Sequence, residues 1–392
     1  MGFLKSMKKA FGGKSSKKGG GGGPDSLQDS LQDPLESGPT VIDPMSGKKV
    51  SGGYSGGGLQ KPSVGPALTD RQLKSSKTLS TDTNIGSLDM VKYKSEIAPG
   101  KGNKGFFKPS GELPQAGQAM MSASSREGGD RAAVRAVMSA RADEFFGTNV
   151  LATEVFAEHS GAMGSVSGMA KGTELRSMVK DKNGDDKTEL NYADLSNGEF
   201  QKGMSNLNVM DYLTGQVDRH GGNIFVDPKT GKVTGIDNDA SFGDEFDGEQ
   251  GYKSGGHSVA NLPEMMDRAT AERIKSADVL DYLELLDGQE GDAEQLTMSE
   301  KMAALERLEK LQAHIEVLEA DGKIVDDWND DTYAAQTDRE YTGDKDAKSY
   351  LEKFAGRAEA ADDNQYGFRW SKSAAKQKQK LSKQQGKMTK NA

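Results

Sequence analysis

The side chains best suited to chemistry lie in residues 217–243, VDRHGGNIFVDPKTGKVTGIDNDASFG, of this 392-residue chain. Asp218 and Asn223 are five positions apart on a glycine-containing loop, which leads into a predicted β-hairpin over residues 223–237. The returning strand of that hairpin ends at Asp237. Because a hairpin brings its two ends together, we expect Asn223 and Asp237 to lie side by side, with the carboxylate of Asp218 nearby.

Amide and carboxylate oxygens are hard ligands, and Mg²⁺ or Mn²⁺ is the metal that such a pair suits. Magnesium in such sites usually keeps some of its waters and shares the phosphate oxygens of a nucleotide. Phosphoryl transfer needs this set of groups, together with a free carboxylate that orients the attacking hydroxyl. The loop therefore predicts a metal-dependent phosphotransferase site with Asn223 and Asp237 as metal ligands.

The motifs of this segment are Asp218-Arg219-His220-x-x-Asn223 and Ile236-Asp237-Asn238-Asp239. They resemble the catalytic loop and metal motif of the atypical protein-kinase-like superfamily, which includes phosphoinositide 3-/4-kinases, actin-fragmin kinase and the secretory-pathway kinases. The resemblance covers roughly residues 100–330 and implies that Asp218 is the catalytic aspartate. Arg219 and His220 belong to the same catalytic loop, where they would shape the loop rather than react.

The resemblance also implies a lysine on an upstream strand that binds the phosphates of ATP. Lys108, within the sequence GFFKP at 105–109, fits this position, and the turn at 100–103 before it could cover the phosphates. Residues 168–170 fall where the family has its hinge. No GxxxxGK[ST] motif occurs, so a Walker loop is excluded.

The acidic partner of this lysine is missing from its usual place. Kinases of this shape usually carry a helix glutamate that pairs with the lysine, but the best register places Ala136 there. Glu127, Asp143 and Glu144 are alternatives before or after that position. The sequence leaves the partner of Lys108 open.

The surrounding elements predict an α+β fold with two lobes, of the protein-kinase-like type, over residues 84–365. The N-lobe (84–172) would be rich in strands, and the C-lobe (173–365) helical. The expected elements are a strand at 102–108 stopped by Pro109, a helix at 130–146 from Asp130 to Gly147, strands at 150–158 and 162–170, a helix at 205–217, and helices within 265–320.

Composition bounds the remaining possibilities. The chain has no Cys and four His, which excludes disulfides, thiolate catalysis and a histidine-rich metal site. The net charge is −9. Both ends of the chain are rich in Lys and lack acids, so the excess of acidic residues lies in the middle of the chain. This negative charge makes nucleic acid an unfavourable partner. We expect a disordered leader at 1–83 and a disordered lysine-rich tail at 366–392, because both lack apolar residues to bury.

The N-terminus matches the myristoylation pattern, with Gly2 after the initiator Met and Ser6 further on. One acyl chain binds a membrane only weakly, and the neighbouring lysines could supply the second signal on an anionic membrane. We expect a cytoplasmic protein with this peripheral membrane contact. The layout also resembles that of secreted bacterial effectors, and an effector would be delivered to a host cell and acylated there.

The function that these observations predict is an ATP- and metal-dependent phosphotransferase. Its acceptor would be a protein hydroxyl or a phosphoinositide. The missing helix glutamate keeps two alternatives open: a pseudokinase that binds nucleotide or a partner, and a kinase-fold enzyme that transfers AMP. The sequence leaves the oligomeric state open.

Overall fold

The computed structural model describes residues 41–42, 49–50, 67–83, 86–98, 100–110, 131–180, 186–191, 193–244, 246–247, 251–252, 261–289, 292–338, 349–363 and 368–391. The chain divides into two compact units, Met1–Gly56 and Gly57–Ala392. The described part of the first unit is the strand pair β1 (Val41–Ile42) and β2 (Lys49–Val50). Gly2 lies outside the described residues. No described helix has the length and apolar character needed to cross a membrane.

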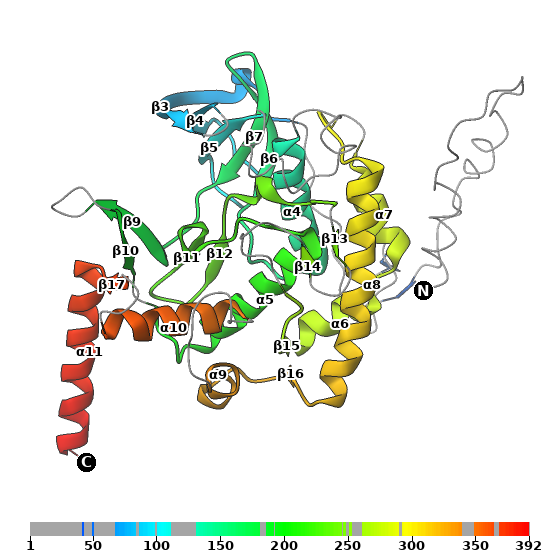
Figure 1. Ribbon diagram of the computed structural model, residues 1–392. Helices are drawn as coiled ribbons and strands as arrows, with labels where there is room; N and C mark the ends of the chain where they lie inside the picture. The colour runs from blue at the N-terminus through cyan, green and yellow to red at the C-terminus, as the bar shows by residue number, and fades with distance from the viewer. Residues whose placement is uncertain are drawn as a thin grey trace, which may run out of the picture. The chain divides into compact units, whose positions relative to one another are not determined.

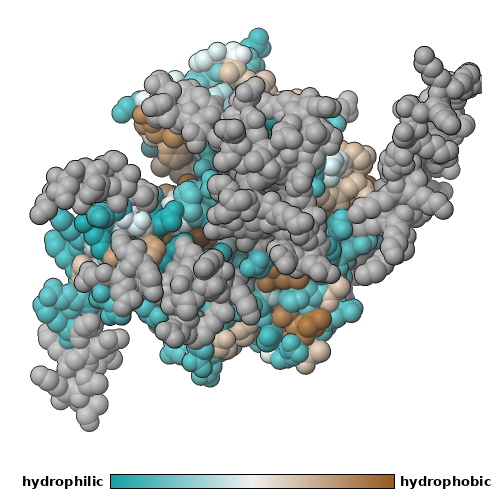
Figure 2. Space-filling view, viewed as in Figure 1, coloured by the Kyte–Doolittle hydropathy of each residue, from teal (hydrophilic) through white to brown (hydrophobic). Residues whose placement is uncertain are grey.

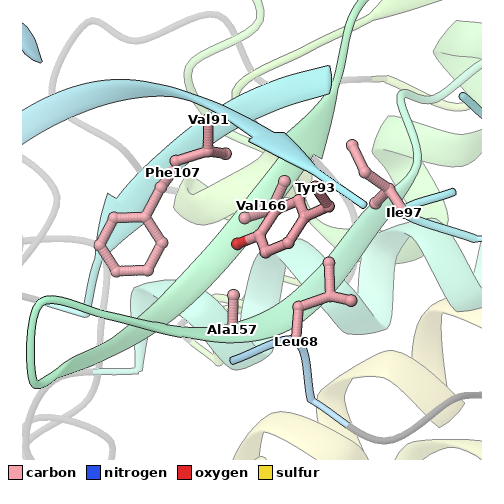
Figure 3. Close-up of a cluster of buried hydrophobic side chains, with 7 residues drawn as sticks. All are labelled: Leu68, Val91, Tyr93, Ile97, Phe107, Ala157 and Val166. Carbon is pink, nitrogen blue, oxygen red and sulfur yellow. The ribbon is translucent and has the colours of Figure 1, made fainter. Parts of the chain in front are cut away.

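A five-stranded antiparallel sheet opens the second unit, with its strands in the order β3-β4-β5-β7-β6 (Figure 1). Its strands are β3 (Leu73–Thr83), β4 (Gly86–Tyr93), β5 (Lys104–Pro109), β6 (Glu154–His159) and β7 (Ala162–Gly168). Figure 3 shows the buried side chains that form its core: Leu68, Val91, Tyr93, Ile97, Phe107, Ala157 and Val166. β6 and β7 are joined by a tight turn in which Ser160 and Gly161 both have positive φ, as a type I′ turn requires.

The ordered lobe begins earlier than the expected residue 84. Leu68 is buried and forms a β-bridge with Ala157 of β6. The Asp70 carboxylate lies 2.8 Å from Nδ1 of the buried His159. Residues 67–83 have little apolar character of their own, so it is their contacts with β4 and β6 that place them in the fold.

The helix α4 (Ala132–Phe146) contacts β6 and β7 and also the 3-10 turn η3 (Asn238–Ala240) of the helical lobe. It ends at Gly147, whose φ of 64° closes the helix as predicted. The residue at its N-cap is Arg131, and Asp130 lies outside the described residues. All but one of its residues are buried, so α4 is a central element between the two lobes.

The second lobe is mainly helical (Figure 1). Its helices are α5 (Gly198–Thr214), α6 (Arg268–Ser276), α7 (Val279–Asp287), α8 (Met298–Ala320), α9 (Asp330–Thr337) and α10 (Tyr350–Asp362). α5 begins seven residues before the expected 205 because the side chain of Asn197 caps it, accepting a hydrogen bond from the Phe200 amide. α8 buries an apolar stripe formed by Leu305, Leu308, Leu311, Ile315 and Leu318.

Short strands complete this lobe. One sheet joins β8 (Thr173–Glu174), β11 (Ile224–Val226) and β12 (Val233–Gly235). A second joins β9 (Arg176–Lys180), β10 (Asp186–Leu190) and β17 (Phe368–Trp370), and two strand pairs are β13 (Phe246–Asp247) with β14 (Gly251–Tyr252) and β15 (Met266–Asp267) with β16 (Ile324–Val325). The 3-10 turns are η1 (Asp70–Gln72), η2 (Gly221–Asn223) and η3.

A helix, α11 (Lys372–Asn391), occupies most of the tail that we expected to be disordered. Its first turn is anchored, because Ala374 is buried and the ammonium of Lys378 lies 2.7 Å from the Asp362 carboxylate of α10. The same ammonium lies 4.3 Å from the ring centroid of Trp370. Of these residues only Asp362 precedes the tail, and its ion pair with Lys378 connects α11 to α10.

The prediction of an α+β fold of the kinase-like type is confirmed, with a β-rich lobe followed by a helical lobe. On the face drawn in Figure 2, hydrophobic residues form small patches separated by hydrophilic ones. Among the described residues, the exposed large hydrophobic side chains are spread over both lobes: Leu79, Met90, Met163, Met169, Leu280, Met298 and Val317.

Candidate active site

The hairpin formed by β11 and β12 carries the loop that the sequence singled out. The amide of Ile236 donates a hydrogen bond of 3.0 Å to the carbonyl oxygen of Asn223. The turn is closed by the Gly231 amide, which donates to the carbonyl oxygen of Asp227 at 2.8 Å. The structure therefore brings Asn223 to the end of the hairpin where Asp237 lies, although both strands are shorter than expected.

The guanidinium of Arg219 joins the separate parts of this loop. It is buried, and its Nε and Nη2 donate to the Asp211 carboxylate of α5 at 2.8 and 2.9 Å. Nη1 donates to the carbonyl oxygens of Asn223 and Ile236, and Nη2 donates to Oδ1 of Asn238 at 2.6 Å. Burial alone would lower the pKa of Arg219, but the neighbouring Asp211 carboxylate outweighs this and raises it. Arg219 thus connects Asn223, Ile236 and Asn238 of the loop to Asp211 of α5.

Asp218 is the exposed carboxylate of the loop. Its backbone amide donates to Oε1 of Gln216 at 2.8 Å, and its carbonyl oxygen accepts from Nδ2 of Asn223 at 3.0 Å. These bonds fix the backbone on both sides while the side chain faces solvent. A carboxylate so placed can accept a hydrogen bond from an incoming hydroxyl group.

His220 acts on the loop through its ring nitrogen. Its Nδ1 accepts a hydrogen bond of 3.1 Å from the Gly222 amide, which opens the turn η2. Burial lowers the pKa of His220, against the opposing charge of Asp218. A neutral ring with an accepting Nδ1 stabilises the turn, so His220, like Arg219, shapes the loop.

Lys108, the last-but-one residue of β5, reaches across to the helical lobe. Its ammonium forms an ion pair with the carboxylate of Asp237 and lies 3.4 Å from Oδ2 of Asp239. Asp237 has a φ of 61°, an unusual conformation for a residue other than glycine, and Nε2 of Gln216 donates to its carbonyl oxygen at 3.0 Å. The proposed nucleotide lysine and the proposed metal ligand therefore meet between the lobes.

The helix α4 supplies no acidic partner for this lysine. Ala136 lines the same small pocket as Lys108, at the position where the sequence register placed the missing glutamate. The Asp143 carboxylate instead accepts hydrogen bonds from the backbone amides of Val150 and Leu151, at 3.0 and 3.1 Å. Glu127 lies outside the described residues.

Glu154, at the start of β6, is the buried acid of this pocket, which it lines together with Lys108, Asp237 and Asp239. Burial raises the pKa of Glu154 to about 7, although a hydrogen bond from Ser167 and the charge of Lys108 act in the opposite direction. No local pattern marks Glu154 in the sequence, because only the order of the strands brings it to this pocket.

Replacing Glu154 by Gln is expected to stabilise the fold much more at pH 8 than at about pH 4. The pKa of Glu154 is raised from 4.5 to about 7 in the folded state, so the cost of ionising this carboxyl in the fold grows as the pH rises from 4.5 to about 7, whereas below pH 4.5 the carboxyl is mostly protonated in both states. The gain at pH 8 should reach at most about 3 kcal/mol. Urea denaturation at the two pH values measures it, and an equal effect at both would contradict the prediction.

A second, larger pocket of ≈ 360 Å³ lies at the predicted hinge. Its lining includes Gly168, Met169 and Ala170 of the hinge, and Gly100 and Lys101 of the expected phosphate-covering turn. Leu151, Ala152, Thr153 and Thr234 are also among its lining residues. Thr153 of this pocket is followed directly in the chain by Glu154 of the lysine pocket.

The oxygen donors present suit a hard divalent cation. Among the described residues, no three or more His, Cys, Asp or Glu side chains are grouped so that they could hold a metal by themselves. An ion bound by Asn223 and Asp237 would therefore complete its shell with phosphate oxygens and water, as Mg²⁺ commonly does. Asp237 and Asp239 already attract the ammonium of Lys108, which shows that a cation is stabilised at this point.

Residues 148–292 match the family model described as phosphatidylinositol 3- and 4-kinase. No curated protein matches the chain. Among solved structures, the chain is similar to the crystal structure of a Helicobacter pylori proinflammatory kinase, CtkA, at 12% sequence identity and a TM-score of 0.37, over 65% of this chain and 97% of that chain. The matched segment contains the whole loop from Asp218 to Asp239 as well as Glu154, while Lys108 precedes it. Through residues 148–292 the chain is therefore similar to phosphatidylinositol 3- and 4-kinases, and the prediction of an atypical kinase-like family is confirmed.

Proposed function

We propose that this protein is an ATP- and metal-dependent phosphotransferase. The observation that carries the proposal is the meeting of Lys108, from the β-rich lobe, with Asp237, from the helical lobe, beside the loop of Asp218 and Asn223. A cation, two oxygen ligands and a free carboxylate at one point are the groups that phosphoryl transfer requires.

Each residue has a distinct part in this proposal. Lys108 binds phosphate oxygens of ATP, whose base occupies the pocket at residues 168–170. Asn223 and Asp237 hold Mg²⁺ or Mn²⁺, which when bound would neutralise charge on the phosphates. Asp218 orients the acceptor hydroxyl for attack. The rate acceleration would then come from positioning and charge stabilisation.

The acceptor in this proposal is a hydroxyl group, either of a protein or of a phosphoinositide. The family match, by its description, includes enzymes that act on phosphatidylinositol, and the lysine-rich ends would favour an anionic membrane. Two alternatives retain support from the alanine at position 136 in place of an acid: a nucleotide-binding protein without catalysis, and transfer of AMP in place of phosphate.

Incubation with ATP labelled in either the γ- or the α-phosphate tests the proposal. We expect label to reach the protein or an added phosphoinositide from γ-labelled ATP only, and to depend on divalent metal. Asp237→Ala should lower the transfer at least about 100-fold, because a metal ligand is worth several kcal/mol in the transition state. Transfer of α-label would indicate AMP transfer, and equal activity of wild type and variant would refute the site.

A further inference from the structure

The ammonium of Lys108 forms ion pairs with Asp237 and Asp239, which both belong to the opposite lobe. One of these groups, Asp237, is also the proposed metal ligand. A carboxylate that binds a divalent cation is a weaker partner for a nearby ammonium, because the cation neutralises its charge. When Asp237 binds metal, Lys108 therefore needs another acidic group to keep its ammonium on the phosphates.

The helix α4 cannot supply that group. The α4 residues that line the lysine pocket are alanines: Ala132, Ala133 and Ala136. Two ion pairs also fix the helix to the helical lobe: Arg135 pairs with Glu300 at 2.8 Å, and Arg141 pairs with Asp292 at 2.6 Å. All four side chains are nearly inaccessible to solvent. A rotation that brought an acid of α4 toward Lys108 would break both pairs.

The five-stranded sheet carries an acidic residue on the face from which Lys108 projects. β7 lies between β5 and β6, and Ser165 of β7 is opposite Lys108 on one side and Phe156 on the other. Residues directly opposite each other, and residues two positions along a strand, point to the same face of a sheet. Glu154, two positions from Phe156, therefore projects from the same face as Lys108.

Electrostatics agrees with this placement. The positive charge of Lys108 lowers the pKa of Glu154, and the negative charge of Asp239 raises it. Both charged groups therefore act electrostatically on this carboxyl. Ser165 and Ser167 form side-chain hydrogen bonds with Glu154 and hold the carboxyl in place. Because Glu154 and Lys108 belong to one sheet, their relation does not depend on how the two lobes are arranged.

We propose that Glu154, on strand β6, is the positioning residue that holds Lys108 on the nucleotide phosphates, in place of the acid that α4 lacks. This inference rests on the proposed function, since it concerns the same ATP site. It assigns the lysine partner to the sheet and leaves α4 a purely structural helix.

The test compares wild type with Glu154→Gln and with Glu158→Gln, a control at an exposed glutamate of the same strand. Calorimetry gives the Kd of ATP and of adenosine in the presence of metal, and steady-state kinetics gives kcat/KM for ATP with metal. In Glu154→Gln, Lys108 should lose the acid that holds it on the phosphates, so ATP binding should weaken about tenfold or more and kcat/KM should fall at least as much. Adenosine binding should not change, and Glu158→Gln should behave as wild type.

The double variant Glu154→Gln/Ala136→Glu provides the decisive comparison, because it moves the acid to the helix position facing the same pocket. We expect it to recover at least part of the lost ATP affinity and kcat/KM. Unchanged or tighter ATP binding by Glu154→Gln would overturn the inference while leaving the proposed function intact. If wild type neither binds ATP nor transfers phosphate, the proposed function itself fails, and the inference fails with it.

Discussion

Replacing Asp218 by Asn is expected to lower the rate of phosphoryl transfer by roughly 10² to 10⁴, the usual contribution of a group that accepts the proton of a hydroxyl. The side chain is exposed, and the bonds that fix this residue use its backbone amide and carbonyl. The substitution should therefore leave the fold, and the KM for ATP, nearly unchanged. The kcat for transfer of γ-phosphate, measured at saturating ATP and acceptor, is the quantity to compare.

A matched control is Asp321→Asn, at an exposed aspartate that follows α8. This variant should retain the wild-type rate. If Asp218→Asn transferred phosphate at the rate of Asp321→Asn, Asp218 would not be the group that orients the acceptor. A drop in thermal stability of Asp218→Asn alone would instead assign the residue a structural part.

Arg219→Met is expected to have the largest effect on stability, about 3–5 kcal/mol of the free energy of unfolding. The substitution leaves the Asp211 carboxylate buried without its ion-pair partner, although the Tyr350 hydroxyl still donates to it at 2.8 Å. It also removes the donors that hold the carbonyl oxygens of Asn223 and Ile236. Urea denaturation at pH 7 measures the loss.

Two further variants identify the cause of that loss. Arg219→Met/Asp211→Asn should be less destabilised than the single variant, because the unpaired buried charge is gone. Arg268→Met removes an arginine whose ion pair with Asp326 is exposed, and it should change the stability little. If Arg219→Met were as mild as Arg268→Met, the guanidinium would not be what holds the loop.

The parts of the site that sequence reasoning could predict are local in the chain. The hairpin between Asn223 and Asp237 needs only a short turn between two strands, so alternating residues and turn chemistry are sufficient to predict it. The same holds for the C-terminal stop of α4 at Gly147. In these cases the interactions that decide the structure join residues close in sequence.

The two segments expected to be disordered, 1–83 and 366–392, were predicted from composition alone, and the structure differs at the inner boundary of each. Residues 67–83 join the sheet because Leu68 fills the core beside β6 and Asp70 pairs with His159. The tail forms α11, anchored at its start by Lys378 on Asp362. A polar segment with few apolar residues can be ordered by a small number of long-range contacts, and composition does not report such contacts.

The sequence was sufficient to predict the groups of the candidate site: a loop with Asp218, Asn223 and Asp237, a strand lysine, and an alanine at position 136 in place of an acid. The tertiary structure alone decided which groups complete that site. Glu154 lines the same pocket as Lys108 because β7 lies between β5 and β6, and Arg219 pairs with Asp211 of α5. Strand order and helix packing depend on burying apolar surface across the whole domain, so no local spacing of residues could have specified either pair.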